Sequence, residues 1–204
     1  MKPLFNLFFM WVLFMTCSFG QTQESACKLA TTNYNVGFND IKSPGPKNQA
    51  LSLPTPYFEL AYEGFDIKAV ARPSDVSDRK YLTYEGTSVS STQAVRKDYN
   101  GSRVENFDLH GFDYKCVRTL FEPERRPCKI TVTGVSGNGE SVSESCNDDW
   151  MRADASFLRC DLKLMKNLKG IRIGTSRGGY PTTNRFTMVT VMDNLSLTVR
   201  RKQC

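Results

Sequence analysis

The feature that most constrains the fold of this chain is a long alternating segment near its carboxyl end, residues 185–200. Its odd-numbered positions from Val189 to Val199 are apolar with one exception, and most of its even-numbered positions are polar. Such a period of two, rich in β-branched side chains, predicts one long half-buried strand. The exception is Asp193, on the apolar face, where a carboxylate is costly unless it is paired, hydrogen-bonded or bound to a metal.

The chain is 204 residues long, and its amino end has the character of a secretory signal peptide. Residues 4–14 form an apolar run too short to span a bilayer, and small side chains precede a cut after Gly20. We therefore expect residues 1–20 to be removed on export. Residues 21–204 are then expected to form a single secreted domain with no transmembrane segment.

The cysteine count predicts a disulfide framework. The chain has seven cysteines, and removal of Cys17 with the signal peptide leaves six. An even number in an exported chain favours disulfides, although six cysteines allow fifteen pairings. A zinc site is disfavoured because there is no C-x-x-C spacing and His110 is the only histidine.

The pairing can be predicted from the expected strands. Two alternating arms flank the turn at residues 137–139, and a cysteine lies at the same distance from Gly137 in each arm, which favours a bridge across a hairpin. The terminal strands of a jelly-roll sandwich often lie side by side, which favours a bridge between the first and last of the six cysteines. The predicted set, with the last pair assigned by elimination, is Cys128–Cys146, Cys27–Cys204 and Cys116–Cys160.

The rest of the chain reads as short strands separated by turns. Alternating segments recur between Pro- and Gly-rich loops, Asn100-Gly101 is a strong turn signal, and no long helical pattern is present. About ten strands with this spacing predict an all-β fold, an antiparallel jelly-roll-like β-sandwich stabilised by disulfides.

The charge distribution says little about a partner. The formal net charge is +6, and the basic residues are scattered apart from residues 125–126, 163–172 and 200–202. Such runs are usually solvated surfaces, and the alternative is a polyanionic partner such as an acidic glycan or membrane headgroups. No nucleic-acid partner is expected, because the chain is exported and carries no nucleic-acid motif.

Four short motifs carry a resemblance to a known group of proteins. They are FND at residues 38–40, PTPY at 54–57, FDL at 107–109 and MDNL at 192–195. With these motifs the chain resembles secreted fungal proteins predicted to form jelly-roll sandwiches. That sandwich is shared with carbohydrate-binding modules and galactose-binding-like domains.

The resemblance implies one candidate metal site. In calcium-containing members of such sandwiches, acidic residues of the first and last strands share a structural ion, and the matching positions here are Asp40 and Asp193. Calcium takes six to eight oxygen ligands, but Asn39 and Asn194 stand where the pattern often has a second acid. The alternative is that Asp193 accepts hydrogen bonds from backbone amides or from a buried Tyr or Arg. No other cofactor is expected.

The sequence marks no catalytic residue. His110 has no G-x-S-x-G motif beside it, and no pair of carboxylates is marked as facing across a cleft. Glu144, Asp148, Asp149 and Asp154 are acids that a glycosidase would need, but acidic loops usually face water. We therefore expect no enzymatic activity.

The sequence favours a binding function over an enzymatic one. Trp150, Tyr180 and Tyr57 lie in polar, turn-rich surroundings, where aromatic rings stack on sugars or anchor protein interfaces. The alternative is that Trp150 folds over an edge of the sandwich as part of the core. Two N-x-S/T sequons predict glycosylation at Asn100 and Asn194.

These observations favour a secreted, monomeric, non-enzymatic binding protein. The first hypothesis is an effector-type protein with a role in virulence, acting on a host protein or a cell wall. The alternative is a carbohydrate-binding module for wall polysaccharide, and the second alternative is a polysaccharide-active enzyme.

Overall fold

A computed structural model of the chain supplies the structure. It describes residues 27–41, 53–69, 80–86, 93–118, 125–148, 156–177 and 188–204. The predicted signal peptide, residues 1–20, lies outside these ranges and stays a prediction.

The described residues form eleven β-strands, and no helix is found among them. The strands are β1 (Lys28–Val36), β2 (Ala61–Glu63), β3 (Asp66–Ala69), β4 (Lys80–Gly86), β5 (Gln93–Arg96), β6 (Val104–Val117), β7 (Cys128–Ser136), β8 (Ser141–Asp148), β9 (Leu158–Asp161), β10 (Leu168–Arg177) and β11 (Met188–Gln203).

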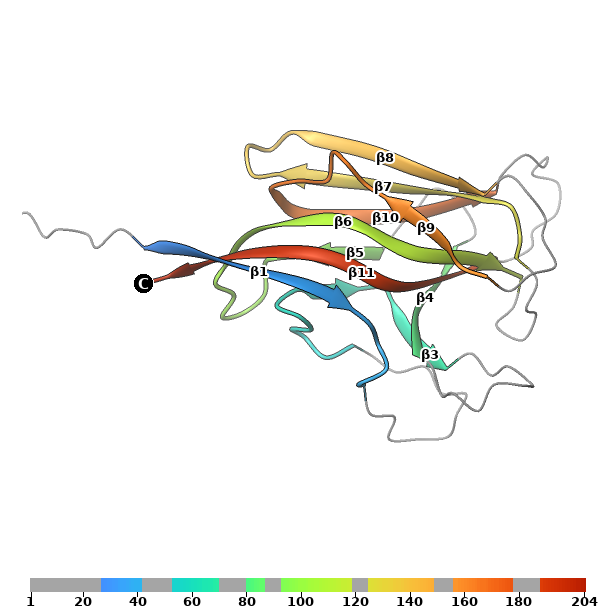
Figure 1. The fold of residues 1–204 in the computed structure, drawn as a ribbon, viewed down its shortest axis with the longest axis horizontal. Helices are drawn as coiled ribbons and strands as arrows, with labels where there is room; N and C mark the ends of the chain where they lie inside the picture. The colour runs from blue at the N-terminus through green and yellow to red at the C-terminus, as the bar shows by residue number, and fades with distance from the viewer. Residues whose placement is uncertain are drawn as a thin grey trace, which may run out of the picture.

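Strand β11, the long strand predicted from the alternating segment, lies at the centre of one layer (Figure 1). One of its edges pairs with β6 over most of its length. Its other edge pairs with β4 through Met188–Met192 and with β1 through Leu195–Gln203. Strand β9 extends this layer beyond β6, and β3 extends it beyond β4.

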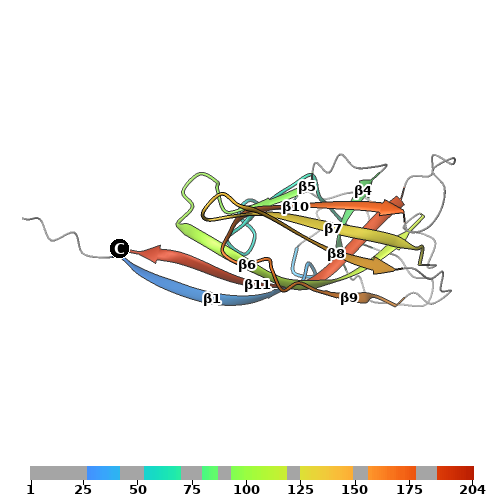
Figure 2. The same ribbon diagram turned by 90° about the horizontal axis from the view of Figure 1, so that it is seen from above.

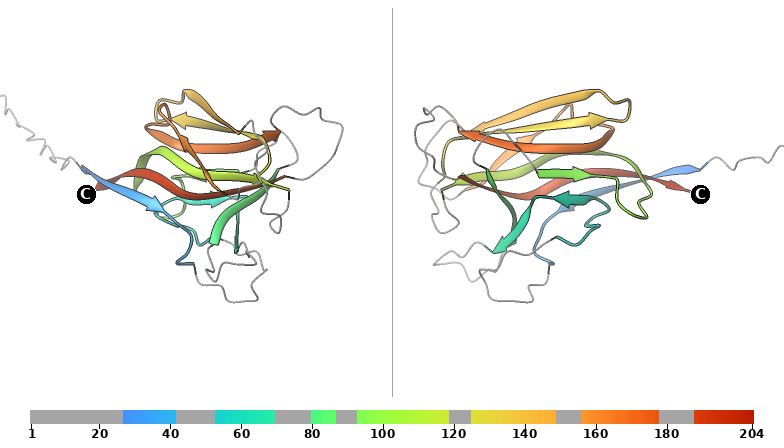
Figure 3. Two further views of the ribbon diagram at one scale, coloured as in Figure 1. Left: turned by 45° about the vertical axis from the view of Figure 1, so that its right-hand side comes forward. Right: turned by 180° about the vertical axis from the view of Figure 1, so that it is seen from behind.

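The second layer is built around β10, which pairs with β7 on one side and β5 on the other. Strands β8 and β2 extend it. A single bridge, Leu168 to Phe107, joins β10 to β6, and Figures 2 and 3 show the β10–β7–β8 group as a layer beside the β6–β11–β1 group. All named pairings are antiparallel, so the prediction of an all-β antiparallel sandwich is confirmed.

The two layers share one hydrophobic core. Ile130 and Ile173 from the β10 layer belong to the same buried cluster as Leu109 and Leu197 from the β11 layer. Hydroxyl groups also link the layers, because Thr175 of β10 is hydrogen-bonded to Tyr84 of β4 and, at 2.7 Å, to Thr190 of β11. Burial of polar groups is tolerated here because each hydroxyl has a partner.

A β-bulge changes which face of β11 points into the core. Before the bulge the core-facing side chains are at even positions, such as Met192, and after it they are at odd positions, such as Leu195. The pairing with β6 shifts register between Asp193 and Ser196, and Asn194 has a φ of 49°. A left-handed residue of this kind is typical of bulges, where asparagine is tolerated.

The prediction that the odd-numbered positions share one buried face along the whole strand is therefore wrong for its first half. Val189 and Val191 lie on the outer face, where a smaller cluster with Val117 and Tyr81 is covered by Phe157. The side chains alternate as predicted, but the extra residue at the bulge reverses the phase of the alternation.

Strand β6 reverses phase at the same place. Leu109 and Phe112 are both buried, which a strict alternation does not allow, and the change falls at Gly111. A Cβ atom at Gly111 would lie 2.4 Å from the backbone carbonyl oxygen of Cys160 in β9. Glycine is needed here because the neighbouring backbone approaches too closely for any side chain.

The structure joins Cys27 to Cys204, the predicted pair, with their Cα atoms 4.6 Å apart. Strands β1 and β11 place them together, because Lys28 lies opposite Gln203 in the register. The bridge closes the end of the β1–β11 ribbon.

The other two predicted bridges are wrong. The hairpin is centred on Asn138 rather than Gly137, so Cys128 faces Asp148 and Cys146 faces Ile130. Diagonal neighbours across a strand pair are roughly 7–8 Å apart, which is too far for a disulfide. The structure instead contains the bridges Cys116–Cys128 and Cys146–Cys160. Each of these ties a strand of the β10 layer to a strand of the β11 layer.

A buried ion pair lies beside the Cys128 end of the hairpin. Arg125 Nε and Asp148 Oδ2 are 2.7 Å apart, and their side chains are 1% and 4% exposed. Removal of one partner from such a pair leaves an uncompensated buried charge.

We expect Asp148→Ala to lower the free energy of unfolding by about 3–5 kcal/mol, because Arg125 would stay buried without its carboxylate. Urea denaturation of the oxidised protein measures this. Asp98→Ala is the control, since its carboxylate is 71% exposed beside Lys97 and such pairs contribute about 0–1 kcal/mol. Equal losses in the two variants would contradict the prediction.

Candidate functional site

The most organised polar surface of the described chain lies on the outer face of β1, β11 and β6, on the Leu195–Gln203 side of the bulge. The register places its side chains in adjacent rows, all from strands rather than loops. We name it the outer polar strip. Its members are Asn33, Asn35, Asn106, Asp108, His110, Ser196, Thr198 and Arg200.

A hydrogen-bond chain crosses the strip from β6 to β1. His110 Nε2 lies 2.7 Å from Thr198 Oγ1, and the Thr198 hydroxyl donates to Asn33 Oδ1 at 2.7 Å. The chain therefore fixes the imidazole, the hydroxyl and the amide relative to one another.

A forked ion pair forms the second part of the strip. Arg200 donates to both carboxylate oxygens of Asp108, at 2.8 and 2.6 Å, and also to Asn106 Oδ1 at 2.9 Å. The backbone N–H of Asn167 donates to Asp108 as well, at 2.7 Å. Such bidentate pairs fix the orientation of both side chains.

The electrostatics of Asp108 follow from these contacts. Burial by itself would raise the pKa of the carboxyl, but the hydrogen bonds from Arg200 and from the N–H of Asn167 outweigh burial and hold the pKa below its usual value. Asp108 is therefore ionised at neutral pH and acts only as an acceptor.

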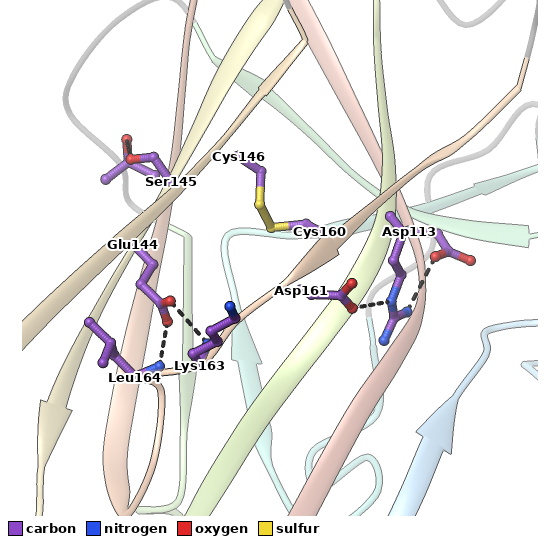
Figure 4. The surroundings of a disulfide bond; sticks show 10 residues. Asp113, Glu144, Ser145, Cys146, Cys160, Asp161, Lys163 and Leu164 are labelled. Carbon is purple, nitrogen blue, oxygen red and sulfur yellow. Dashed lines mark hydrogen bonds and ion pairs between the residues drawn. A yellow bond between two sulfur atoms is a disulfide. The ribbon is translucent and has the colours of Figure 1, made fainter.

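At the bulge, the strip continues into a second network around Arg159 of β9. Its guanidinium lies 3.2 Å from Asp113 and 3.1 Å from Asp161, and Figure 4 labels these two acidic residues. It also donates to the backbone oxygen of Asn194 at 3.1 Å, and the Asn194 amide donates to Asp113 at 2.7 Å.

The segment after β9 borders the strip along the edge of β6. Glu144 of β8 accepts hydrogen bonds from the backbone N–H groups of Lys163 and Leu164, at 2.9 and 2.8 Å (Figure 4). The Cys146–Cys160 bridge lies beside these contacts. Glu144, one of the acids considered for catalysis, thus has a structural partner.

Tyr57 is not an exposed ring. It is 7% exposed, and its hydroxyl lies 2.6 Å from the Gly37 carbonyl oxygen and 2.5 Å from Asp40 Oδ1. Burial, and then the hydrogen bond to the Asp40 carboxylate, raise the pKa of this hydroxyl. The prediction of Tyr57 as a ligand contact is wrong, because the ring packs in the core with Phe38 and Phe58.

The structure brings the two predicted calcium ligands to the same end of β1. Asp40 accepts from Tyr57, and Asp193 accepts from the N–H of Asn194 at 2.9 Å beside Gly37. The described residues contain no group of three or more His, Cys, Asp or Glu side chains arranged to hold a metal. Each of the two carboxylates accepts a hydrogen bond from the protein.

The remaining predicted site residues divide into two groups. Trp150 and Tyr180 lie outside the residues that the structure describes. Asn100 is exposed in the turn before β6, and Asn194 is exposed at the bulge, so the structure leaves both sequons at the surface.

Comparisons with known proteins identify the fold only. No family model matches this chain, and no curated protein matches it. The solved structures that resemble it include a DUF4465 family protein from Bacteroides caccae ATCC 43185, at 11% identity and a TM-score of 0.51, covering 81% of this chain and 98% of that one.

Two further structures resemble it less. A DUF4465 family protein from Bacteroides ovatus ATCC 8483 matches at 10% identity and a TM-score of 0.42, covering 86% of this chain and 99% of that one. TmCBM61, in complex with β-1,4-galactotriose, matches at 12% identity and a TM-score of 0.34, covering 68% and 85%. The match to the Bacteroides caccae protein supports the fold of this chain. None of the three matches supports the resemblance to fungal proteins.

Sequence reasoning did not find the outer polar strip. The signal was present as two alternating polar faces, one at Ser196, Thr198 and Arg200 and one at residues 106–110. What was missing was the register that places these faces side by side.

The described residues also include no helix long and apolar enough to cross a membrane.

The pKa of Asp108 gives a pH-dependent prediction. Because the folded-state pKa is lowered, the Asp108–Arg200 contact stabilises the fold above the unfolded-state pKa, near 3.8, and this contribution is lost as the pH falls through the folded-state value. The wild type should therefore have a higher free energy of unfolding than Asp108→Asn at neutral pH, and this difference should shrink at acidic pH. Urea denaturation at both pH values tests this, and a constant difference would contradict it.

The protein donors at Asp40 and Asp193 give a prediction about calcium. We expect neither calcium nor a chelator to move the thermal unfolding midpoint, because both carboxylates are already hydrogen-bonded. Scanning calorimetry measures this. A rise in the midpoint with calcium that Asp193→Asn abolishes would establish a structural ion and overturn the prediction.

Proposed function

We propose that this chain is an exported, non-enzymatic binding protein whose outer polar strip recognises a polysaccharide at a cell wall or host surface. The observation that carries the proposal is the strip itself. Amide, carboxylate, guanidinium, imidazole and hydroxyl groups stand in neighbouring rows on rigid strands and are oriented by one another.

The chemistry of the strip suits a sugar. Vicinal hydroxyl groups donate and accept in directions that planar amide, carboxylate and guanidinium groups can match. Since the Arg200–Asp108 fork and the His110–Thr198–Asn33 chain are already formed, little side-chain entropy is lost when a ligand binds. The sequence-based prediction assigned the sugar contacts to aromatic rings. We assign them to the planar amide, carboxylate and guanidinium groups of the strip.

The contacts of the acidic side chains support a non-catalytic role. Asp108 is held by Arg200, Asp148 by Arg125 and Glu144 by two backbone amides. Carboxylates used in glycosidase chemistry face a cleft and exchange protons with the substrate. The acids named here are instead committed to partners within the fold.

The extracellular assignment rests on the disulfides. Three bridges are typical of proteins that fold in an oxidising compartment, and they agree with the predicted signal peptide at residues 1–20. In a eukaryotic secretory route we expect a glycan on Asn100, which lies in an exposed turn.

The ligand class separates this proposal from its alternatives. An effector-type protein acting in virulence on a host protein would be expected to use a buried apolar or aromatic anchor, whereas the strip is polar throughout. The strip therefore favours the polysaccharide over the host protein. The proposal includes a monomeric state and no nucleic-acid partner.

The test is a pull-down of the oxidised protein, residues 21–204, on insoluble chitin, β-glucan, cellulose, xylan and immobilised polygalacturonate. We expect retention on one polymer, reduced at least about tenfold in a variant carrying Asn33→Ala and His110→Ala, because both side chains belong to the strip. The matched control carries Thr131→Ala and Ser145→Ala, a hydroxyl pair 3.2 Å apart on the outer face of β7 and β8.

Three results would change the proposal. Loss of binding in the control as well would show that the strip is not the site. Loss with Trp150→Ala and not with the strip variant would move the site to Trp150. Retention on no polymer, polygalacturonate included, would favour a protein partner and the effector-type hypothesis.

A further inference from the structure

Two basic runs of the sequence, residues 163–172 and 200–202, meet at one end of the strip. Strand β10 begins at Leu168, which bridges to Phe107 of β6, and β11 ends beside the start of β6, where the N–H of Lys202 donates to the Arg103 carbonyl oxygen at 3.1 Å. Lys97 joins them, since its N–H donates to the Lys169 carbonyl oxygen at 3.1 Å.

These contacts bring together a basic cluster from four strand ends, defined as Lys97, Arg103, Lys169 and Lys202. Two of the four cations have acidic partners: Asp98 pairs with Lys97 at 2.8 Å, and Glu105 pairs with Lys202 at 2.9 Å. Arg103 and Lys169 are exposed and have no acidic partner among the residues that the structure describes. The cluster therefore keeps an excess of positive charge.

The lowered pKa of Glu105 reflects the same excess of positive charge. The hydrogen bond from Lys202 lowers the pKa of this carboxyl most, and the charges of Lys97 and Lys169 lower it further. Three cations thus act on one carboxylate although they come from β11, from the end of β5 and from β10.

The cluster continues the outer polar strip. Lys202 follows Arg200 by two residues in β11, so both side chains point to the same side of the strand. Arg200 and Arg201 are themselves neutralised, by Asp108 and Glu59. A chain-like ligand lying along the strip would pass from neutral donors and acceptors to uncompensated cations at this end.

We infer that the polysaccharide is an acidic one, whose sugar hydroxyls contact the outer polar strip and whose carboxylates contact the basic cluster. This inference rests on the proposed function and adds the class of sugar, a polyuronate. Charge complementarity is the reason, because Arg103, Lys169 and Lys202 are exposed and a repeating carboxylate presents negative charge along the whole ligand.

The test compares polygalacturonate with its methyl ester, which has the same backbone without the charges. Affinity electrophoresis or calorimetry should show binding of polygalacturonate that weakens as salt rises, and weaker binding of the ester. A variant carrying Arg103→Glu and Lys169→Glu should bind polygalacturonate at least about tenfold more weakly. Both side chains are exposed, so the thermal unfolding midpoint should be unchanged.

The matched control carries Lys129→Glu and Arg172→Glu, two exposed cations on the outer face of the β10 layer. It has the same net charge as the cluster variant and should retain wild-type affinity within about twofold. Equal losses in the two variants would show that net charge alone is responsible and would overturn the inference. Equal affinity for the acid and the ester would overturn it too.

The remaining outcomes separate this inference from the proposed function. In one outcome the protein is retained on a neutral polymer, the strip variant abolishes this retention, and polygalacturonate is not bound. This result would overturn the inference of an acidic polysaccharide and leave the proposed function standing. Binding of phosphatidylserine vesicles and not of polygalacturonate, lost in the cluster variant, would assign the cluster to a membrane surface and overturn the inference. Absence of binding to every polysaccharide would overturn both.

Discussion

The pairing of β11 with β6 is the interaction on which the rest of the structure depends. Both strands carry an irregularity at the same level, at Asn194 in β11 and at Gly111 in β6, so both reverse phase together and stay in register on either side. If only one strand reversed phase, one half of the pair would turn its apolar side chains to solvent. The close approach of the Cys160 carbonyl to Gly111 lets β9 cover this level of β6.

The phase reversal also divides the outer face of the layer in two. On the side toward Met188, the outward residues Val189 and Val191 are apolar and are covered by Phe157. On the side toward Gln203, the outward residues Ser196, Thr198 and Arg200 are polar and form the strip with β1 and β6. A single structural device thus produces a covered apolar patch and a hydrogen-bonding surface on the same face, and on that surface Asn33, Asn35 and His110 are exposed while Asp108 and Thr198 are buried. The proposed binding surface is therefore a consequence of the core packing.

The covalent and ionic links hold this arrangement rigid. The bridges Cys116–Cys128 and Cys146–Cys160 tie the two layers, and the second of them, with Glu144, fixes the segment that borders the strip. Sequence reasoning identified all six cysteines and one of the three bridges. It failed on the other two because a hairpin whose turn is centred one residue further along changes which residues face each other, and nothing local in the sequence distinguishes the two registers.

The sequence by itself determined the fold class, the long final strand and the side-by-side placement of the chain ends, because alternation, turn residues and cysteine count are local properties. It also drew attention to Asp193, although not to the bulge beside it. Only the tertiary structure decided that Tyr57 is buried, that Asp148 pairs with Arg125 and that the polar faces of three strands form one surface. These depend on strand register and on contacts between residues far apart in the chain, and such contacts leave no periodic signal in the sequence.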